Sequence, residues 1–192
     1  MSDTRVLPLP ASSTLFVVDL QERLVPAMSA ADQAGVIKAA GNLIALWAPD
    51  QGSGGDVLFS EQYPRGLGPT VPAIQAELAL VPGARRIEKT SFSVCADPSY
   101  DHAERPVQRD VVLVGMETHV CVLLTGLDLL QRGHRVFVPH DAVASRTERN
   151  RDNGLALLAK EGAVIVNSET LIFHALGQAG GDRFKRFSAR IR

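Results

Sequence analysis

Short runs of β-branched and other apolar residues recur along the chain, separated by segments whose apolar residues repeat at helical spacing. Residues 111–114 (Val-Val-Leu-Val) are apolar throughout, which is typical of a strand covered by helices on both faces of a sheet. The alternation of strands and helices predicts parallel strands joined by right-handed crossovers. The six predicted strands are residues 15–19, 56–60, 86–89, 110–116, 135–139 and 163–166.

The predicted helices have recognisable starts and stops. Ser29 precedes the first helix and is a residue type that caps helix N-termini. Gly133 ends the helix with the clearest leucine repeat. Ser145 and Glu148 have the spacing of a capping box, which predicts Ser145 as the N-cap of a helix that Gly162 closes. The predicted helices are residues 31–47, residues 120–132, the segment after Ser145, residues 170–176 and residues 182–191.

These elements predict a single α/β domain over residues 1–192. Two folded units would each have to build a core from fewer than about a hundred residues, which is unfavourable. The expected fold is a three-layer αβα sandwich around a six-stranded, mostly parallel, doubly wound sheet. Ligands bind to such sheets beyond the carboxyl ends of the strands, at the topological switch point, so functional residues are expected there.

Composition and charge narrow the set of partners. The chain has 20 Lys and Arg residues against 21 Asp and Glu residues, a net charge of −1, and no long run of either sign. This balance gives no electrostatic footprint for nucleic acid or for an anionic membrane surface. The longest apolar run, residues 111–116, is far shorter than the roughly 20 residues that span a bilayer. We therefore expect a protein that binds neither nucleic acid nor membrane.

Cysteine content and the N-terminal segment indicate the compartment. Two cysteines, Cys95 and Cys121, are too few for the disulfide framework of a small secreted fold. Residues 1–13 lack the apolar core and the cleavage pattern of a signal peptide. Both observations predict a cytoplasmic protein.

Three reactive side chains follow predicted strands. Asp19 ends the first strand, Lys89 ends the third, and Cys121 lies in the first turn of the helix after the fourth. Taken singly, they are consistent with a capping aspartate, a solvated lysine and a small buried cysteine. Taken together, they are expected to converge at one sheet edge, where Asp19 accepts the thiol proton and Lys89 favours the thiolate. The positive end of the helix dipole is also expected to stabilise the Cys121 thiolate.

The motifs around these residues resemble those of the isochorismatase-like cysteine hydrolases, which include nicotinamidases. The similar segments are residues 16–21 (Phe-Val-Val-Asp-Leu-Gln), 88–92 (Glu-Lys-Thr-Ser-Phe) and 112–121 (Val-Leu-Val-Gly-Met-Glu-Thr-His-Val-Cys). Residues 128–133 and 141–146 extend the resemblance to nearly the whole chain. Because the three motifs occur in order, the match is specific.

The resemblance implies a catalytic triad formed here by Asp19, Lys89 and Cys121. It also implies a non-proline cis peptide bond between Met116 and Glu117. The backbone amides of Glu117 and Cys121 would then form an oxyanion hole for the tetrahedral intermediate.

The chain departs from the nicotinamidase pattern in one respect. Nicotinamidases of the family carry an aspartate and two histidines as a metal site near the second strand, whereas residues 59–69 of this chain contain no histidine. Glu61 alone is a poor metal site. We therefore expect no catalytic metal and no cofactor, and we place the chain in an isochorismatase-domain subgroup without that site.

Four residues are candidates for the substrate pocket: Gln21, Tyr63, Phe92 and Met116. The alternative for Tyr63 and Phe92 is that they pack in the core, as aromatic residues beside a parallel sheet usually do. His119 precedes Cys121 by two residues. Because positions this close in one turn point apart, Asp19 and Lys89 are the expected partners of the thiol.

The expected activity is hydrolysis of a small-molecule substrate, at a C–N (amide) bond, through a thioester on Cys121. One alternative is hydrolysis of a vinyl ether with Asp19 as the acid, and another is a non-catalytic binding scaffold. A dinucleotide-dependent oxidoreductase is excluded, because residues 19–23 (Asp-Leu-Gln-Glu-Arg) stand where Gly-x-Gly-x-x-Gly would be needed. The protein is expected to form a homo-oligomer, a dimer or a tetramer.

Overall fold

The computed structural model describes residues 7–49, 54–98, 100 and 110–192. Its centre is a sheet with the strand order β3-β2-β1-β4-β5-β7, in which neighbouring strands run parallel. The two-residue strand β6 pairs with β4 alongside this path. The strands are β1 (Ser13–Val18), β2 (Asp56–Gln62), β3 (Arg85–Lys89), β4 (Asp110–Met116), β5 (Arg135–Pro139), β6 (Val143–Ala144) and β7 (Val164–Val166).

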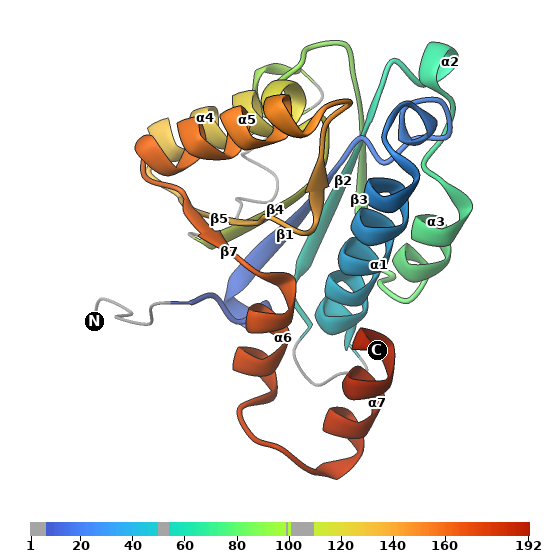
Figure 1. The fold of residues 1–192 in the computed structure, drawn as a ribbon, viewed down its shortest axis with the longest axis vertical. Helices are drawn as coiled ribbons and strands as arrows, with labels where there is room; N and C mark the ends of the chain where they lie inside the picture. Colours follow the sequence, from blue (N-terminus) through green and yellow to red (C-terminus); the bar gives the residue numbers. More distant parts are fainter. Residues whose placement is uncertain (1–6, 50–53, 99, 101–109) are drawn as a thin grey trace.

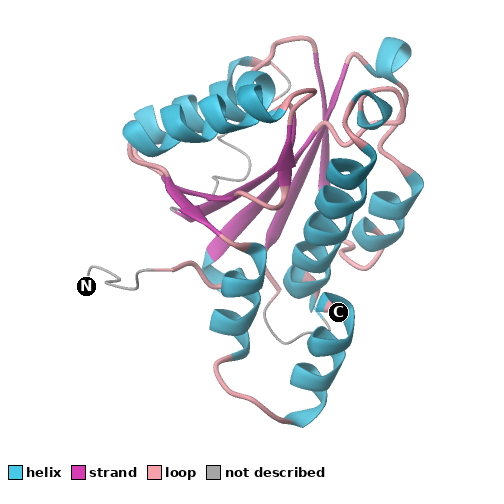
Figure 2. Cartoon of the chain, in the orientation of Figure 1, coloured by secondary structure: helices cyan, strands magenta, loops and turns pink. Residues whose placement is uncertain are grey.

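Helices cover both faces of the sheet (Figures 1 and 2). One face carries α1, α3, α6 and α7, and the other carries α4 and α5. No described helix has both the length and the apolarity to cross a membrane. The helices are α1 (Ala30–Trp47), α2 (Pro64–Leu67), α3 (Pro72–Leu78), α4 (Leu123–Gln131), α5 (Glu148–Lys160), α6 (Ser168–Leu176) and α7 (Gly181–Ile191), with a π-helical turn, η5 (Thr118–Val122), directly before α4.

This arrangement confirms the predicted three-layer α/β sandwich. The central strands have continuous apolar sequences because their side chains alternate between two cores. On β1, Leu15 and Val17 belong to the core beneath α1, whereas Phe16 and Val18 belong to the core beneath α4 and α5. The apolar pattern predicted neither β6, which has two residues, nor the short helices α2 and α3.

One of the two helix N-caps predicted from the sequence is confirmed. Ser29 is the N-cap of α1, and its side chain accepts a hydrogen bond from the Asp32 amide. The prediction for Ser145 is wrong, because Thr147 is the N-cap of α5 and accepts from the Asn150 amide. Ser145 follows β6 directly and its hydroxyl lies 3.0 Å from His119 Nδ1. The helix therefore begins three residues after Ser145, at Glu148.

Gly115 allows β4 to approach β1 where β1 ends. Its φ of +121° lies outside the usual range of residues with a side chain. A Cβ atom at this position would lie 1.9 Å from the Val18 carbonyl oxygen. Val18 directly precedes Asp19, which itself has a φ of +51°. The close approach of the two strands thus fixes the backbone that carries Asp19.

We expect Gly115→Ala to destabilise the protein by about 3 kcal/mol or more, since it combines a left-handed backbone with a backbone clash. Gly162→Ala is the matched control, because Gly162 has a φ of +106° and a methyl group added there would meet no neighbouring side chain or strand within 4 Å. The control should lose about 1 kcal/mol, from the backbone alone. Urea unfolding of both variants measures the difference, and equal losses would contradict the close approach.

Candidate active site

The strand order brings the ends of three strands to one crevice. The chain runs outward from β1 to β2 and β3, returns to β4 on the other side of β1, and continues to β5 and β7. The switch point therefore lies between β1 and β4. Asp19 follows β1, Lys89 ends β3, and Cys121 lies in η5 after β4. The structure brings these three predicted residues together.

Asp19 and Lys89 form a buried ion pair. Lys89 Nζ lies 2.7 Å from Asp19 Oδ2, and neither side chain is exposed to solvent. Ser60 Oγ donates a hydrogen bond of 2.7 Å to the other carboxylate oxygen, Oδ1. Two buried charges need near-ideal geometry and further hydrogen bonds to offset their desolvation. Asp19 has both, because each of its oxygens accepts a short hydrogen bond.

The Lys89 ammonium has further acceptors on the protein. Gln62 Oε1 lies 2.7 Å from Nζ. The carbonyl oxygens of Phe92 and Ser91 lie at 3.2 and 3.4 Å. These contacts hold the ammonium from the side of β2 and from the loop after β3.

Cys121 is a buried thiol close to the ion pair. Burial raises its pKa to about 12, and the charge of Asp19 adds to this effect. The Lys89 ammonium acts in the opposite direction and lowers the pKa. Desolvation thus opposes the stabilisation of the thiolate that the helix start and Lys89 are expected to give, and the thiolate at Cys121 stays a prediction.

The peptide bond between Met116 and Glu117 is cis, at the position that the resemblance implies. Glu117 is buried, and its Oε2 accepts hydrogen bonds from the Arg146 backbone amide at 3.1 Å and from Arg146 Nε at 3.0 Å. This ion pair ties the turn before Cys121 to the segment before α5. The role of the Glu117 and Cys121 amides as an oxyanion hole stays a prediction.

The predicted pocket residues fall into two groups. Gln21 and Met116 are fully buried, and Met116 belongs to the core beneath α1. Tyr63 and Phe92 are 56% and 57% exposed, so neither packs in the core. The backbone of each residue is hydrogen-bonded to Lys89. The Tyr63 amide donates to the Lys89 carbonyl oxygen, and the Phe92 carbonyl oxygen accepts from Lys89 Nζ. They stay candidates for substrate contact.

Sequence reasoning missed Ser60 and Gln62. Leu58, Ser60 and Gln62 follow one another at every second position of β2, so they share one face of the strand. Leu58 faces the core that contains Cys121. Two polar residues at alternate positions near the end of a buried strand were a usable signal. Their period of two predicts that both side chains reach the same face as the site.

Glu61, the residue left at the nicotinamidase metal position, is engaged by the protein. Its Oε1 accepts from the Thr70 amide at 2.7 Å and from the Thr70 hydroxyl at 2.8 Å, and its Oε2 accepts from Arg86 Nε at 2.9 Å. Burial raises the pKa of Glu61, but these hydrogen bonds outweigh it and the net pKa is lowered. Across the described residues, no three His, Cys, Asp or Glu side chains are grouped to hold a metal ion.

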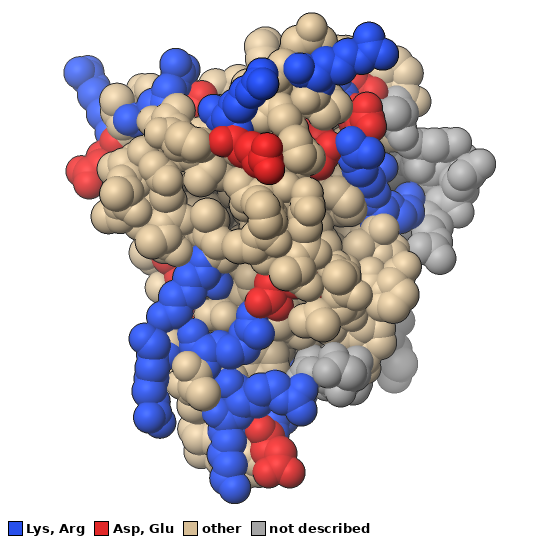
Figure 3. Space-filling model, turned by 90° about the vertical axis from the view of Figure 1, so that its right-hand side faces the viewer, with Lys and Arg blue, Asp and Glu red and all other residues tan. Residues whose placement is uncertain are grey.

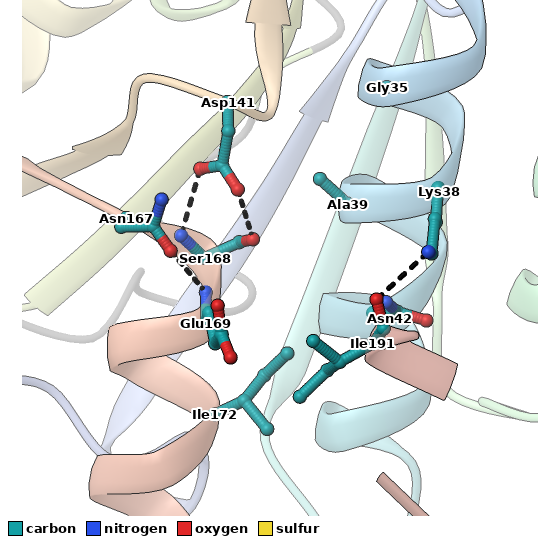
Figure 4. A pocket seen from close by; sticks show the side chains of 10 residues that line it. All are labelled: Gly35, Lys38, Ala39, Asn42, Asp141, Asn167, Ser168, Glu169, Ile172 and Ile191. Carbon is teal, nitrogen blue, oxygen red and sulfur yellow. Dashed lines mark hydrogen bonds between the residues drawn. The ribbon is translucent and has the colours of Figure 1, made fainter. Parts of the chain in front are cut away.

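A cavity of about 230 Å³ lies on the α1 side of the sheet, away from Cys121 (Figure 4). Its polar residues bond to one another or to the backbone. Asp141 accepts from the Ser168 amide at 2.8 Å at the start of α6, and Lys38 Nζ donates to the Ile191 carbonyl oxygen at 2.9 Å. Asp141 therefore caps a helix, and Lys38 attaches the end of α7 to α1.

The fold and the residues at its switch point define a doubly wound α/β protein with a candidate cysteine-based site. The chain matches the isochorismatase domain family over residues 13–170. Isochorismatase domain-containing protein 2A of Mus musculus is 36% identical over 188 residues, which cover 96% of this chain and 84% of the mouse protein. The chain therefore belongs to the isochorismatase-like hydrolase family.

Solved structures agree with this assignment. The structure of MAR1 ribonuclease from Caenorhabditis elegans is similar with a TM-score of 0.83 and 34% identity, covering 96% of this chain and 91% of that one. The YcaC gene product of Escherichia coli, described as an octameric hydrolase of unknown specificity, has a TM-score of 0.79 over 99% of this chain and 89% of its own. At 17% identity, YcaC supports the fold alone.

We expect Lys89→Met to destabilise the protein by about 3 to 5 kcal/mol, because it leaves the Asp19 carboxylate buried without its partner. Adding Asp19→Asn to this variant should recover part of the loss, because no charge is then left behind. Lys160→Met, at an exposed lysine of α5, is the control and should change little. Urea unfolding tests the ion pair, and losses that simply add in the double variant would contradict it.

Proposed function

We propose that this protein is a cysteine hydrolase that cleaves a C–N (amide) bond of a small molecule through a thioester on Cys121. The observation that carries the proposal is the solvent-free Asp19–Lys89 pair beside the Cys121 thiol at the switch point. A carboxylate, a cation and a thiol in contact supply the base, the counter-charge and the nucleophile that acyl transfer needs. Family membership supports hydrolysis as the reaction class.

In the proposed first step, Asp19 takes the proton of Cys121 while Sγ attacks the acyl carbon. Because burial raises the pKa of the thiol, the proton is proposed to leave during the attack rather than before it. Lys89 stabilises the negative charge that develops on sulfur. The Glu117 and Cys121 amides would hold the oxygen of the tetrahedral intermediate.

Collapse of that intermediate breaks the C–N bond. Asp19, which now carries the proton, gives it to the leaving nitrogen, and an amine or ammonia departs. A water molecule then attacks the thioester while Asp19 accepts one of its protons. The thiolate leaves as the C–S bond breaks, recovers the proton from Asp19, and a carboxylic acid is released.

A second candidate function uses the same residues without a thioester. The raised pKa of Cys121 favours it, since burial disfavours the thiolate that would act as the nucleophile. In this reaction Asp19 takes the proton of the Cys121 thiol and passes it to the vinyl carbon of the ether. Water adds to the resulting oxocarbenium ion and returns a proton to the thiolate, and the C–O bond of the hemiketal then breaks to release an alcohol and a carbonyl compound. The third possibility, a binding scaffold, would leave the buried pair without a chemical role.

We propose a small molecule rather than RNA as the substrate, although the similar C. elegans protein is called a ribonuclease. An RNA substrate brings several phosphates, which exposed cations must neutralise. Lys89 has no exposed side-chain surface. The described residues that line the pocket beside it include one exposed cation, Arg65, and two acids, Glu88 and Asp97, a balance that does not favour several phosphates. In the view of Figure 3, basic side chains lie at the upper end of the molecule, with acidic ones among them, and also at the lower end, where α7 lies. In Figure 1, α2, which follows β2, lies at the upper end.

The reactivity of Cys121 should respond in opposite directions to its two neighbours. Asp19 raises the pKa of the thiol and Lys89 lowers it. Asp19→Asn should therefore speed alkylation by iodoacetamide about tenfold at pH near 8, and Lys89→Met should slow it by a similar factor. Peptide mapping by mass spectrometry gives the rates, with Cys95 as the internal reference. Asp152→Asn, on the exposed surface of α5, is the matched control, and parallel changes in both variants would contradict the assigned contacts.

Turnover should behave differently from alkylation. In a panel of small amides and esters, Cys121→Ala and Asp19→Asn should both lose turnover, although Asp19→Asn leaves the thiol more reactive. Intact-protein mass spectrometry during turnover should show an acyl adduct on wild-type Cys121. Full turnover by Cys121→Ala would rule out the thioester. Turnover of a vinyl ether added to the panel, if it needs Asp19 and forms no adduct, would favour the second reaction.

We also propose that the protein is a homo-oligomer, a dimer or a tetramer. Leu124 on α4 and Leu157 on α5 are exposed apolar side chains on the outer surface, which supports association. The E. coli protein YcaC, which shares the fold, is described as octameric. Light scattering after size exclusion should give a dimer or tetramer mass, and a monomer at all concentrations would refute the proposal.

A further inference from the structure

The Lys89 ammonium is saturated by acceptors that belong to the protein. An ammonium group has three N–H donors. One points to Asp19 Oδ2 at 2.7 Å and one to Gln62 Oε1 at 2.7 Å. The third lies between the carbonyl oxygens of Phe92 and Ser91, at 3.2 and 3.4 Å. The Cys121 thiol is a further hydrogen-bond partner of this ammonium. The acceptors of the protein therefore outnumber the three donors, and no donor is left over for a bound molecule.

Gln62 is itself held in one orientation. Its Nε2 donates to the Thr90 carbonyl oxygen at 2.8 Å, so its Oε1 faces Lys89. Its backbone amide donates to Gln21 Oε1 at 2.8 Å, and Gln21 Nε2 returns a bond of 3.1 Å to the Gln62 carbonyl oxygen. Gln21 Nε2 also donates to the Gly68 carbonyl at 2.7 Å. The two amide side chains clamp the end of β2 beside the ammonium.

We propose that Gln62 is a positioning residue that acts through Lys89. Its amide oxygen takes up one N–H of the ammonium, which keeps Lys89 aligned on Asp19 and turned away from the substrate. Lys89 then acts on the charges of Asp19 and Cys121 and makes no contact with the substrate. This inference rests on the proposed function for its catalytic meaning, but the hydrogen-bond arrangement can be measured without turnover.

A neutral acceptor suits this position better than a carboxylate. A second carboxylate at 2.7 Å would share the Lys89 charge with Asp19 and add a negative charge near the thiol. The thiol would then be harder to deprotonate. An amide oxygen satisfies the N–H and leaves the charge of Lys89 directed at Asp19.

The ammonium signal of Lys89 provides a direct test. The chain has four lysines, and the other three, Lys38, Lys160 and Lys185, are exposed. In protein labelled with ¹⁵N-lysine, Lys89 should give a slowly exchanging ammonium signal, whereas exposed ammonium groups exchange quickly with water. Gln62→Met removes the acceptor and should speed proton exchange of this signal about tenfold or more, because one N–H is then open to water.

Gln62→Glu keeps a hydrogen-bond acceptor at this position but adds a negative charge. This variant should keep the slowly exchanging Lys89 signal but slow alkylation of Cys121 by iodoacetamide about tenfold, since the added charge raises the pKa of the thiol. Gln75→Met is the matched control, because the Gln75 amide bonds to the Thr70 carbonyl, away from Lys89. It should change neither reading.

The outcomes distinguish the two proposals. An unchanged Lys89 signal in Gln62→Met, with the variant folded as judged by its unfolding midpoint, would overturn the role of Gln62. A second outcome is that the Lys89 signal changes as expected in Gln62→Met while wild-type Cys121 forms no adduct with any amide or ester. That pair of results would support the hydrogen-bond arrangement and refute the thioester. Equal effects of Gln62→Met and Gln75→Met would show a general loss of structure and would also overturn the role of Gln62.

Discussion

The structure depends on a pair of opposite charges held entirely out of water. Asp19 and Lys89 have no exposed side-chain surface, so each must find its full set of partners inside the fold. The parallel sheet meets this requirement by bringing the ends of β1 and β3 to the same edge, with β2 between them. Ser60 and Gln62, both on β2, supply the donor and the acceptor that the pair still needs. The register of three strands is thus tied to one ion pair.

In the proposed mechanism, the same pair would allow a neutral thiol to act as a nucleophile in a dry site. With Cys121 protonated, Asp19 and Lys89 together carry no net charge. Transfer of the thiol proton to Asp19 produces a neutral acid and a thiolate, and the thiolate then stands opposite the Lys89 ammonium. One ion pair replaces another, and the number of buried charges does not change. The desolvation that raises the pKa of the isolated thiol is therefore smaller for the coupled transfer, because Lys89 is never left without an anion.

The sequence predicts the strands and the three reactive side chains because both depend on local patterns. Continuous apolar runs mark the central strands, and Asp19, Lys89 and Cys121 follow such runs closely. Other features depend on contacts between distant segments. Burial of Cys121 by neighbouring elements raises the pKa of its thiol and so opposes the effect expected from its helix position. Pairing of β6 with β4 holds the chain up to Ala144 in the sheet, and the cap moves to Thr147. Gln62 resembles any polar residue at a strand end until β3 places Lys89 beside it.

In this site, the side chains proposed to carry out the reaction are separate from those that are candidates for substrate contact. Asp19 is fully buried, the donors of Lys89 are filled by the protein, and Cys121 is buried with 6% of the residue exposed. In the proposed reaction, a substrate would therefore gain little binding energy from these three side chains. Its recognition must come from side chains around the opening, and Tyr63 and Phe92 flank Lys89 with their side chains exposed. Loops that differ in sequence around one buried set of reactive groups would allow one fold to serve many substrates.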